Sequence, residues 1–461
     1  MPPEKKKLKV FDIICLAFTA LFSIELVAGQ ASIGPSVIVW LLTFGVIYLL
    51  CHGLICAELG STYPDQGGNY VWIERAYGHK WASRMTWWCW TNLVAFVPSV
   101  FVAMVIVLQQ IFDLDISSMD IMFISIIGIW VIVAMNCVSI RDSKIVSNIG
   151  AVFKVIFCVA LIGGGAWIVF TQGSQTEFTM DTVFPPLDIA AFGLVGTLIY
   201  GMTGFDLPSA NAGQMDNPKK DVPRALLLTG VVCIVLYLLS DLAVMWVLPL
   251  EGIDPAYGMI DAIIAIYGAS QAAVVIIGAM LAFIYISYIF SWTIGGNAAA
   301  LEAGSDGDLP GFYAKTNKFK APVGAAILMG LGATALILVY GFTADSNENL
   351  FWTLLAFTSI TFFPPYFLIS FALFKLRKSD PNAERPFKIP GKVFPYVVGA
   401  VNVICLSIAT IAYLVPPEGE DPVSYTLFMV AGVLVVLVLG EIIAAGSEKR
   451  RAKIEAAGTA E

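Results

Sequence analysis

The segment Gly201-Met202-Thr203-Gly204-Phe205-Asp206-Leu207-Pro208 interrupts an apolar stretch, from about 192 to 214, that is otherwise suited to the interior of a lipid bilayer. Two glycines, a carboxylate and a proline lie where a passive anchor would present apolar side chains. Backbone that leaves the helical hydrogen-bond ladder is tolerated at bilayer depth only where protein or a watery cavity satisfies its polar groups. The interruption therefore predicts a binding site inside the membrane.

The composition around this segment is that of a protein that crosses the membrane many times. The chain has 461 residues, of which 58% are hydrophobic and 13% charged, and its mean hydropathy is +0.82. Soluble domains are less apolar than this. Stretches of the roughly 20 apolar residues that cross a bilayer recur about twelve times. We predict spans at 10–34, 36–59, 81–112, 119–139, 145–170, 187–213, 225–248, 271–300, 322–342, 350–374, 393–415 and 424–445.

The positions of lysine and arginine support this set of spans. Cytoplasmic loops retain these residues and translocated loops lose them. They occur before the first span and in alternate connections: Lys5, Lys6, Lys7, Lys9, Arg75, Lys80, Arg141, Lys144, Lys219, Arg224, 315–320 and 375–392. Both termini are therefore expected in the cytoplasm. The chain divides into a cytoplasmic start (1–9), two halves of five helices (10–170 and 187–374), two further helices (393–445) and a cytoplasmic tail (446–461).

The first span carries a second interruption, at Phe22-Ser23-Ile24-Glu25-Leu26-Val27-Ala28-Gly29, and Gly34-Pro35 separates it from the second span. The two interruptions occupy corresponding positions in the two halves. Paired breaks of this kind are typical of transporters built from inverted repeats, with a site between the halves. The ends of the half-helices carry partial charges that suit a carboxylate at the N-terminus and an ammonium at the C-terminus.

Four segments resemble the amino acid/polyamine/organocation superfamily, in order along the chain. The first, at 57–72, reads AELGSTYPDQGGNYVW. The second combines Gly204-Phe205-Asp206 with MDNPKKDVPRA at 215–225. The third combines DGDLP at 306–310 with Lys315-Thr316-Asn317, and the fourth reads RPFKIPG at 385–391. The resemblance covers nearly the whole chain.

This resemblance implies an all-α integral membrane fold. Twelve transmembrane helices would adopt the LeuT-like five-plus-five inverted repeat, with helices one and six broken and helices eleven and twelve outside the repeat. The chain most resembles the branch that contains glutamate/γ-aminobutyrate antiporters and other amino acid/amine antiporters. It departs from many relatives by having Leu21-Phe22-Ser23-Ile24-Glu25 in place of a glycine pattern in helix one. Gln214 stands where relatives often have glutamate.

The paired breaks and the resemblance together indicate the substrate site. Tyr200 lies where relatives place an aromatic gate, and Trp292 lies in a stretch similar to the substrate-facing part of helix eight. The alternatives are helix-capping roles for Glu25 and Asp206 and ordinary packing roles for the two aromatics. We expect substrate to be bound by Ser23, Ile24, Glu25, Tyr200, Gly201, Thr203, Gly204, Asp206 and Trp292, with Tyr200 and Trp292 also serving as gates.

Lys154 stands well inside a span, between Val152-Phe153 and Val155-Ile156. A buried ammonium is costly unless it is paired or loses its proton. In similar sodium-independent transporters a helix-five lysine occupies the place of a sodium ion and bridges to helix one. The resemblance thus implies a coupling role for Lys154. The alternative is a lysine that reaches to the cytoplasmic edge, toward which we expect it to lie.

These observations predict a secondary transporter for amino acids or their amine derivatives. We expect it in the plasma membrane of a bacterium. We expect sodium-independent exchange; proton-coupled symport and a non-transporting nutrient sensor are the alternatives. Carboxylates at the breaks favour substrates that bear an ammonium. Two histidines and no HExxH or GxSxG motif argue against an enzyme. We expect no cofactor, no metal and no nucleic acid, only substrate and the lipid bilayer as partners, and the sequence specifies no oligomeric state.

Overall fold

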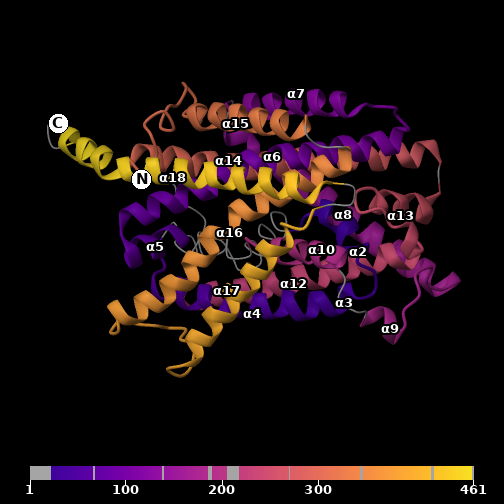
Figure 1. Ribbon diagram of the computed structural model, residues 1–461, viewed down its shortest axis with the longest axis horizontal. Coiled ribbons are helices and arrows are strands. Elements are labelled where there is room, and N and C mark those ends of the chain that lie inside the picture. The colour runs from indigo at the N-terminus through magenta and orange to yellow at the C-terminus, as the bar shows by residue number, and fades with distance from the viewer. Residues whose placement is uncertain are drawn as a thin grey trace.

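The computed structural model describes residues 22–65, 68–137, 140–184, 189–204, 217–268, 270–342, 346–416 and 420–458. Within these ranges the chain forms helices joined by loops, without a β-strand (Figure 1). The helices are α2 (Ile24–Ala31), α3 (Val37–Trp40), α4 (Val46–Thr62), α5 (Asn69–Tyr77), α6 (His79–Phe112), α7 (Ser118–Asn136), α8 (Ile140–Gln172), α9 (Met180–Val183), α10 (Ile189–Tyr200), α12 (Pro218–Val247), α13 (Gly258–Tyr267), α14 (Gln271–Ser305), α15 (Val323–Gly341), α16 (Asn347–Ser379), α17 (Phe394–Ala412) and α18 (Pro422–Gly458).

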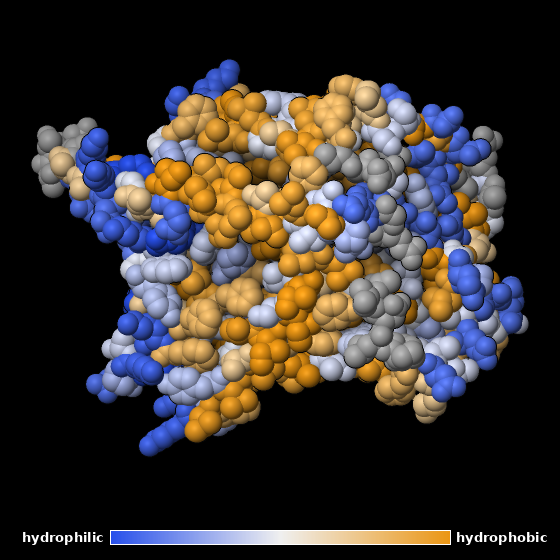
Figure 2. Space-filling model, in the orientation of Figure 1, coloured by the Kyte–Doolittle hydropathy of each residue, from blue (hydrophilic) through white to orange (hydrophobic). Residues whose placement is uncertain are grey.

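In the part of the chain that the structure describes, ten helices are long and apolar enough to cross a membrane. Each overlaps one of the predicted spans. The other two predicted spans are the broken ones, which are described only as the short helices α2 and α10 because residues 1–21 and 205–216 lie outside the described ranges. Figure 2 shows apolar residues over the middle of the visible face and hydrophilic residues at both ends, as expected for a protein that spans a bilayer.

Helix α6 is buried among other helices of the molecule. In its most apolar stretch 94% of the residues are buried, against 22% for α18, so α6 lies among other helices and α18 faces the surroundings. Helices α14, α15, α16 and α18 all pack against α6. Exposed rings on other helices, such as Phe170 with 88% of its surface accessible, are suited to contact with lipid.

Two groups of four helices can be recognised from their contacts. Helices α2, α4, α10 and α12 contact one another through the pairs α2–α10, α2–α12 and α4–α12. Helices α6, α7, α14 and α15 form the second group, in which every pair is in contact. Helix α8 packs against α12 on one side and α14 on the other. It therefore lies between the group that contains both breaks and the group built around α6.

Candidate functional site

The break in the first span lies at Phe22 and Ser23. Ser23 has an extended backbone (φ −91°, ψ 103°), and α2 begins directly after it at Ile24. This corrects the sequence-based expectation that the interruption continues to Gly29, because residues from Ile24 onward are already helical. Ser23 leaves the helical ladder, so the polar backbone groups at the break need partners from elsewhere in the fold.

Two side chains supply partners for these backbone groups, and a third, from another helix, bonds the Ser23 side chain. The Tyr237 hydroxyl accepts a hydrogen bond from the Ser23 backbone N–H over 2.9 Å. The Lys154 ammonium donates to the Phe22 carbonyl over 2.6 Å. Tyr288 on α14 shares a hydrogen bond of 2.8 Å with the Ser23 hydroxyl. The break is thus held by both helix groups and by α8, which lies between them.

Lys154 lies at the centre of this arrangement. Its side chain is only 2% exposed, and its ammonium is also 4.3 Å from the centre of the Tyr288 ring, a cation–π contact. The ammonium and the carboxylate of Glu25 are close enough for their charges to attract. The alternative in which Lys154 reaches to the cytoplasmic edge is therefore wrong, and so is the expectation that it lies toward that end, away from the breaks.

The break in the sixth span begins where α10 ends, at Tyr200. Residues 201–204 form turns, and Gly204 has a positive φ of 91° that favours glycine. The Thr203 hydroxyl donates to the Tyr200 carbonyl over 2.6 Å. A Cβ atom on Gly201 would lie 3.0 Å from the Tyr237 hydroxyl oxygen, so glycine lets Tyr237 touch this break as well as the first. Asp206, predicted to bind substrate, lies outside the described residues.

A small cavity lies between the two breaks. It is lined by Ser23, Asn92, Phe96, Tyr200, Thr203, Tyr288, Trp292 and Phe362. Its volume of about 20 Å³ leaves room for about one water molecule, so the cavity must widen to admit an amino acid or an amine. Five of the eight lining residues are aromatic, and ring faces can hold an ammonium group.

A second cavity lies beside the first along α2. Ile24, Glu25 and Ala28 line it together with residues of α6, α14 and α16 and the segment around α13. Helix α6 contributes Asn92 and Phe96 to the first cavity and Ala103, Ile106 and Val107 to the second. The second cavity therefore lies nearer the C-terminal end of α6. Glu25, at 9% exposed, is the single carboxylate among the lining residues of either cavity.

The structure brings together four of the nine predicted substrate-binding residues at the first cavity: Ser23, Tyr200, Thr203 and Trp292. Ile24 and Glu25 line the neighbouring cavity instead, and Gly201 and Gly204 are buried in the turn after α10. Sequence reasoning missed Asn92, Phe96, Tyr288, Phe362 and, at the break, Tyr237. Asn92 alone carried a signal, as an amide within an apolar span, and its side chain donates to Thr358 of α16.

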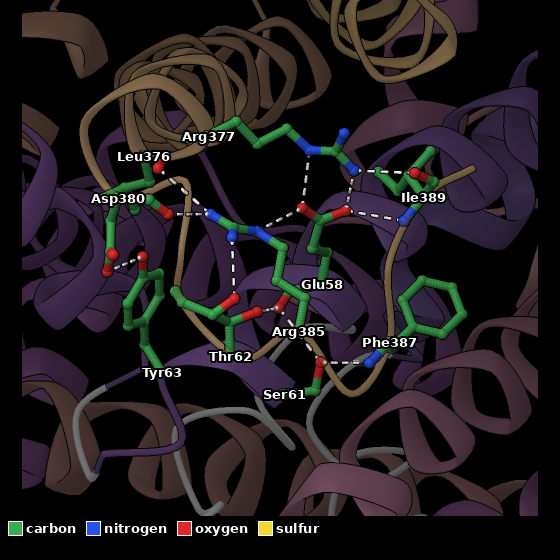
Figure 3. A network of polar contacts seen from close by, with 11 residues as sticks. Glu58, Ser61, Thr62, Tyr63, Leu376, Arg377, Asp380, Arg385, Phe387 and Ile389 are labelled. Atoms are coloured by element: carbon green, nitrogen blue, oxygen red, sulfur yellow. Dashed lines mark hydrogen bonds and ion pairs between the residues drawn. The ribbon is translucent and has the colours of Figure 1, made fainter. Parts of the chain in front are cut away.

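Two of the four recognised segments meet at one end of the molecule, where Glu58 of α4 forms a buried network with α16 and the loop that follows it (Figure 3). Glu58 is 1% exposed. It accepts a hydrogen bond of 2.8 Å from Nε of Arg377, lies 3.3 Å from Nε of Arg385 and accepts from the Ile389 backbone N–H over 2.8 Å. The Phe387 N–H donates to the Ser61 hydroxyl over 3.3 Å. We call these residues the Glu58 clasp.

Comparisons with known proteins place the chain in a family. A family model described as amino acid permease matches residues 8–439. A probable agmatine/putrescine antiporter of Lactococcus lactis subsp. lactis is 29% identical over 450 residues, covering 96% of both chains. An uncharacterized transporter of Legionella pneumophila is 25% identical, covering 95% of this chain and 97% of the relative. A glutamate/γ-aminobutyrate antiporter of Lactococcus lactis subsp. lactis is 21% identical, covering 97% and 92%.

Proposed function

The chain belongs to the amino acid permease family, and on that premise we propose that it exchanges amine-bearing solutes across the membrane without sodium. Membership of the amino acid/amine antiporter branch is confirmed: this is a multi-pass membrane protein that transports amino acids or amines, consistent with the bacterial plasma membrane, and not an enzyme. The proposal adds the exchange mode, the independence from sodium and the charge of the substrate.

The contact between Lys154 and the Phe22 carbonyl carries this proposal. A carbonyl freed from the helix at bilayer depth needs a cation or a hydrogen-bond donor, and sodium fills this need in transporters with broken helices. Here an ammonium donates to that oxygen over 2.6 Å from α8. Because the chain supplies its own cation, the first break can be stabilised in every transport cycle without an ion from solution.

The preferred substrate in this proposal carries a positive charge or is a zwitterion. The ammonium group of the substrate would lie against the rings of Tyr200, Tyr288 and Trp292, which line the cavity between the breaks. Glu25 in the neighbouring cavity would attract the same group or a second cationic group. The Lys154 ammonium offsets part of the Glu25 charge. The preference for cationic substrates is therefore weaker than it would be if the Glu25 and Asp206 carboxylates were both without a nearby cation.

Transport would proceed by alternating access. The group of α2, α4, α10 and α12 would rock against the group of α6, α7, α14 and α15, with the site between them. Tyr200 comes from the first group and Trp292 from the second, since α14 carries Trp292. Both line the cavity, so a rocking motion would change the distance between these rings and could cover or release the substrate.

Counterflow in proteoliposomes tests the proposal. Vesicles containing the purified protein would be loaded with unlabelled agmatine, putrescine, γ-aminobutyrate or glutamate and exposed to the labelled solute. We expect uptake of a labelled amine to require an internal amine. Uptake driven by a pH gradient into empty vesicles would instead indicate a proton symporter, and binding without flux would indicate a sensor. Either of these results would contradict the proposal.

A further inference from the structure

A buried carboxyl group lies on α12, outside both cavities. Asp241 is 0% exposed, and neither of its carboxyl oxygens has a hydrogen-bond partner in the part of the chain that the structure describes. Buried polar groups normally have such a partner, and an ionised carboxylate at bilayer depth is costly unless a cation lies beside it. Asp241 is absent from the lining of the two cavities, so substrate binding there does not account for it.

Asp241 lies on the face of α12 that reaches the helix breaks. Tyr237 comes one helical turn earlier, so the two side chains lie on the same face of the helix. The Tyr237 hydroxyl accepts from the Ser23 N–H, which places this face against the first break. Just after Asp241, Ala243 packs against Gly165 of α8. Asp241 therefore lies where α12, a member of the group that carries the breaks, meets α8.

No charged side chain in the described part of the chain stabilises an Asp241 carboxylate. Helices α2, α4, α8 and α13 and the stretch 37–45 pack against α12. Burial acts on Asp241 without a compensating charge interaction. The acidic and basic side chains described on these helices, and the Tyr267 hydroxyl, have partners elsewhere: Glu25 with Lys154, Lys154 with the Phe22 carbonyl, His52 with Cys56, Glu58 with Arg377, Asp261 with Gln110, and Tyr267 with the Ala160 carbonyl.

A short segment after α8 covers the end of α12 that lies next to Asp241. The backbone N–H groups of 175–176 donate to the carbonyls of 245–246 over 3.1 Å each. Glu177, which follows this segment, is exposed and does not face Asp241. The Ser240 hydroxyl, beside Asp241, is also buried and has no partner in the described residues. Water that entered after a movement of this segment would therefore satisfy two neighbouring polar groups.

This environment favours the neutral form of Asp241. Removing a carboxylate from water without a cation or a hydrogen-bond donor beside it disfavours the charged form. A proton neutralises the charge by forming an O–H bond to one carboxyl oxygen, and it needs no cavity. A metal ion would need several ligands, and among the described residues no group of three His, Cys, Asp or Glu side chains could hold one.

We propose that Asp241 is a proton-binding site that controls closure of the outer side of the transporter. In the closed arrangement the carboxyl group holds a proton. When the 175–176 segment leaves the end of α12, water reaches Asp241 and the proton passes to it. Lys219 and Arg224 predict that α12 begins in the cytoplasm, so its covered end faces outward. Closure then requires one proton to return from the outer solution to the carboxylate.

The direction of the pH effect follows from the state that binds the proton. A hydrated aspartate is ionised above about pH 4. Where the open state is ionised and the closed state protonated, closure takes up one proton, so its equilibrium constant falls up to about tenfold for each unit by which the pH rises. Acid therefore favours the closed arrangement. The proton site is a property of the fold, and only its effect on exchange rests on the proposed function.

Infrared spectroscopy of the intact protein in lipid nanodiscs tests the proton site without transport. The spectra would be recorded in sodium buffer at about pH 5.5, where a hydrated aspartate is ionised. Asp241→Asn should remove the C=O band of a protonated carboxylic acid from the wild-type spectrum. Asp421→Asn is the matched control, because Asp421 is exposed and accepts from the Ser424 N–H, and it should remove carboxylate bands instead. Loss of carboxylate bands in Asp241→Asn, the result expected if sodium occupied the site, would overturn the proposal.

Counterflow tests the role of the proton in closure. The pH would be the same inside and outside the vesicles, so that no proton gradient drives uptake. We expect the wild-type rate to fall about tenfold or more between about pH 5.5 and about pH 7.5. Asp241→Asn, which is neutral throughout, should keep its rate, and Asp421→Asn should respond as wild type does. A wild-type rate independent of pH, or a response retained by Asp241→Asn, would overturn the role in closure. Absence of exchange at every pH would count against the proposed function, whereas the infrared result alone decides the proton site.

Discussion

At the scale of single residues, side chains from distant helices hold the polar backbone groups of the first helix break. Lys154 donates to the Phe22 carbonyl and Tyr237 accepts from the Ser23 N–H. Tyr237 also touches the second break through Gly201. Tyr237 therefore contacts both breaks. A movement of the backbone at one break would shift Tyr237 and, through it, the backbone at the other break. This arrangement suits a site that must reorganise as a unit.

The aromatic side chains of the cavity give a residue-scale prediction. Trp292→Ala and Tyr200→Ala remove ring faces that line the cavity, so each should reduce exchange at least tenfold while surface expression stays near wild type. Initial rates of counterflow, normalised to protein in the vesicles, measure this. Trp167→Ala is the matched control, since Trp167 is 66% exposed on α8 and should be neutral. Normal affinity and turnover in both cavity variants would make these rings ordinary packing residues.

Glu25 supplies the prediction about substrate charge. Glu25→Gln keeps the shape of the side chain and removes its charge, so it should weaken binding of a cationic amine by more than tenfold, or about 1.4 kcal/mol. Binding of a net anion should not weaken. Competition of unlabelled amines and of glutamate against labelled substrate measures cation binding and anion binding separately. Glu177→Gln is the control, because Glu177 is exposed. Asp206→Asn, outside the described residues, should act in the same direction. If glutamate is preferred, or if both neutral variants bind amines normally, the electrostatic proposal fails.

At the scale of helices, the Glu58 clasp joins α4 of the first group to α16 and the loop that leads to α17. Arg377 belongs to α16, and the other members lie in two of the recognised segments, which gives a physical reason for the residues that these segments contribute to the clasp. RPFKIPG places Arg385 and the Ile389 N–H at one carboxylate, and AELGS supplies that carboxylate together with the Ser61 hydroxyl. The clasp fixes the position of the 380–391 loop on the end of α4.

Removal of the Glu58 charge should destabilise the protein strongly. Glu58→Gln leaves Arg377 and Arg385, 14% and 6% exposed, without their carboxylate, and breaking a buried ion pair in this way costs about 3–5 kcal/mol. Asp65→Asn is the control, because its partner Arg75 is 49% exposed and surface pairs contribute about 0–1 kcal/mol. Thermal unfolding in detergent should show a large loss for the first variant only. Equal midpoints would contradict a stabilising role for the clasp.

Two neighbouring glycines test the packing of α8. A Cβ atom on Gly165 would lie 3.0 Å from the Cα of Ala243 in α12, whereas one on Gly163 would meet nothing within 4 Å. Gly165→Ala should therefore destabilise by about 1–3 kcal/mol through overpacking. Gly163→Ala should be neutral or stabilising by up to about 1 kcal/mol, since alanine favours helix. Thermal midpoints of the two variants measure the difference, and equal effects would show that α8 and α12 do not pack as described.

At the scale of the whole molecule, hydropathy predicted the helices well because each span must satisfy its own backbone in lipid. The predicted spans 81–112 and 322–342 correspond to α6 and α15 almost residue for residue. The position of Lys154 could not be predicted in this way. Helix α8 begins at Ile140, five residues before the predicted span, so Lys154 lies deeper along the helix than the hydropathy boundary suggests.

The contacts of the site were beyond local sequence reasoning for a different reason. Ser23 and Tyr288 are 265 positions apart, and Glu58 and Arg377 are 319 apart. No periodicity within one span indicates which residue of a distant span it will meet. The glycines and the carboxylates at the breaks were visible because they violate the composition of a membrane helix. Phe96, Tyr237 and Phe362 were not visible, because aromatic residues are ordinary in such helices.

The exchange rate in the presence and absence of sodium tests the central claim most directly. Proteoliposomes loaded with an unlabelled amine would take up labelled amine in sodium buffer and in buffer where choline replaces sodium, for wild type, Lys154→Ala and the exposed-surface control Lys318→Ala. We expect wild type and the control to transport equally in both buffers, and Lys154→Ala to lose at least nine-tenths of its rate, about 1.4 kcal/mol of barrier. Strict sodium dependence of the wild type, or full activity of Lys154→Ala, would contradict the account.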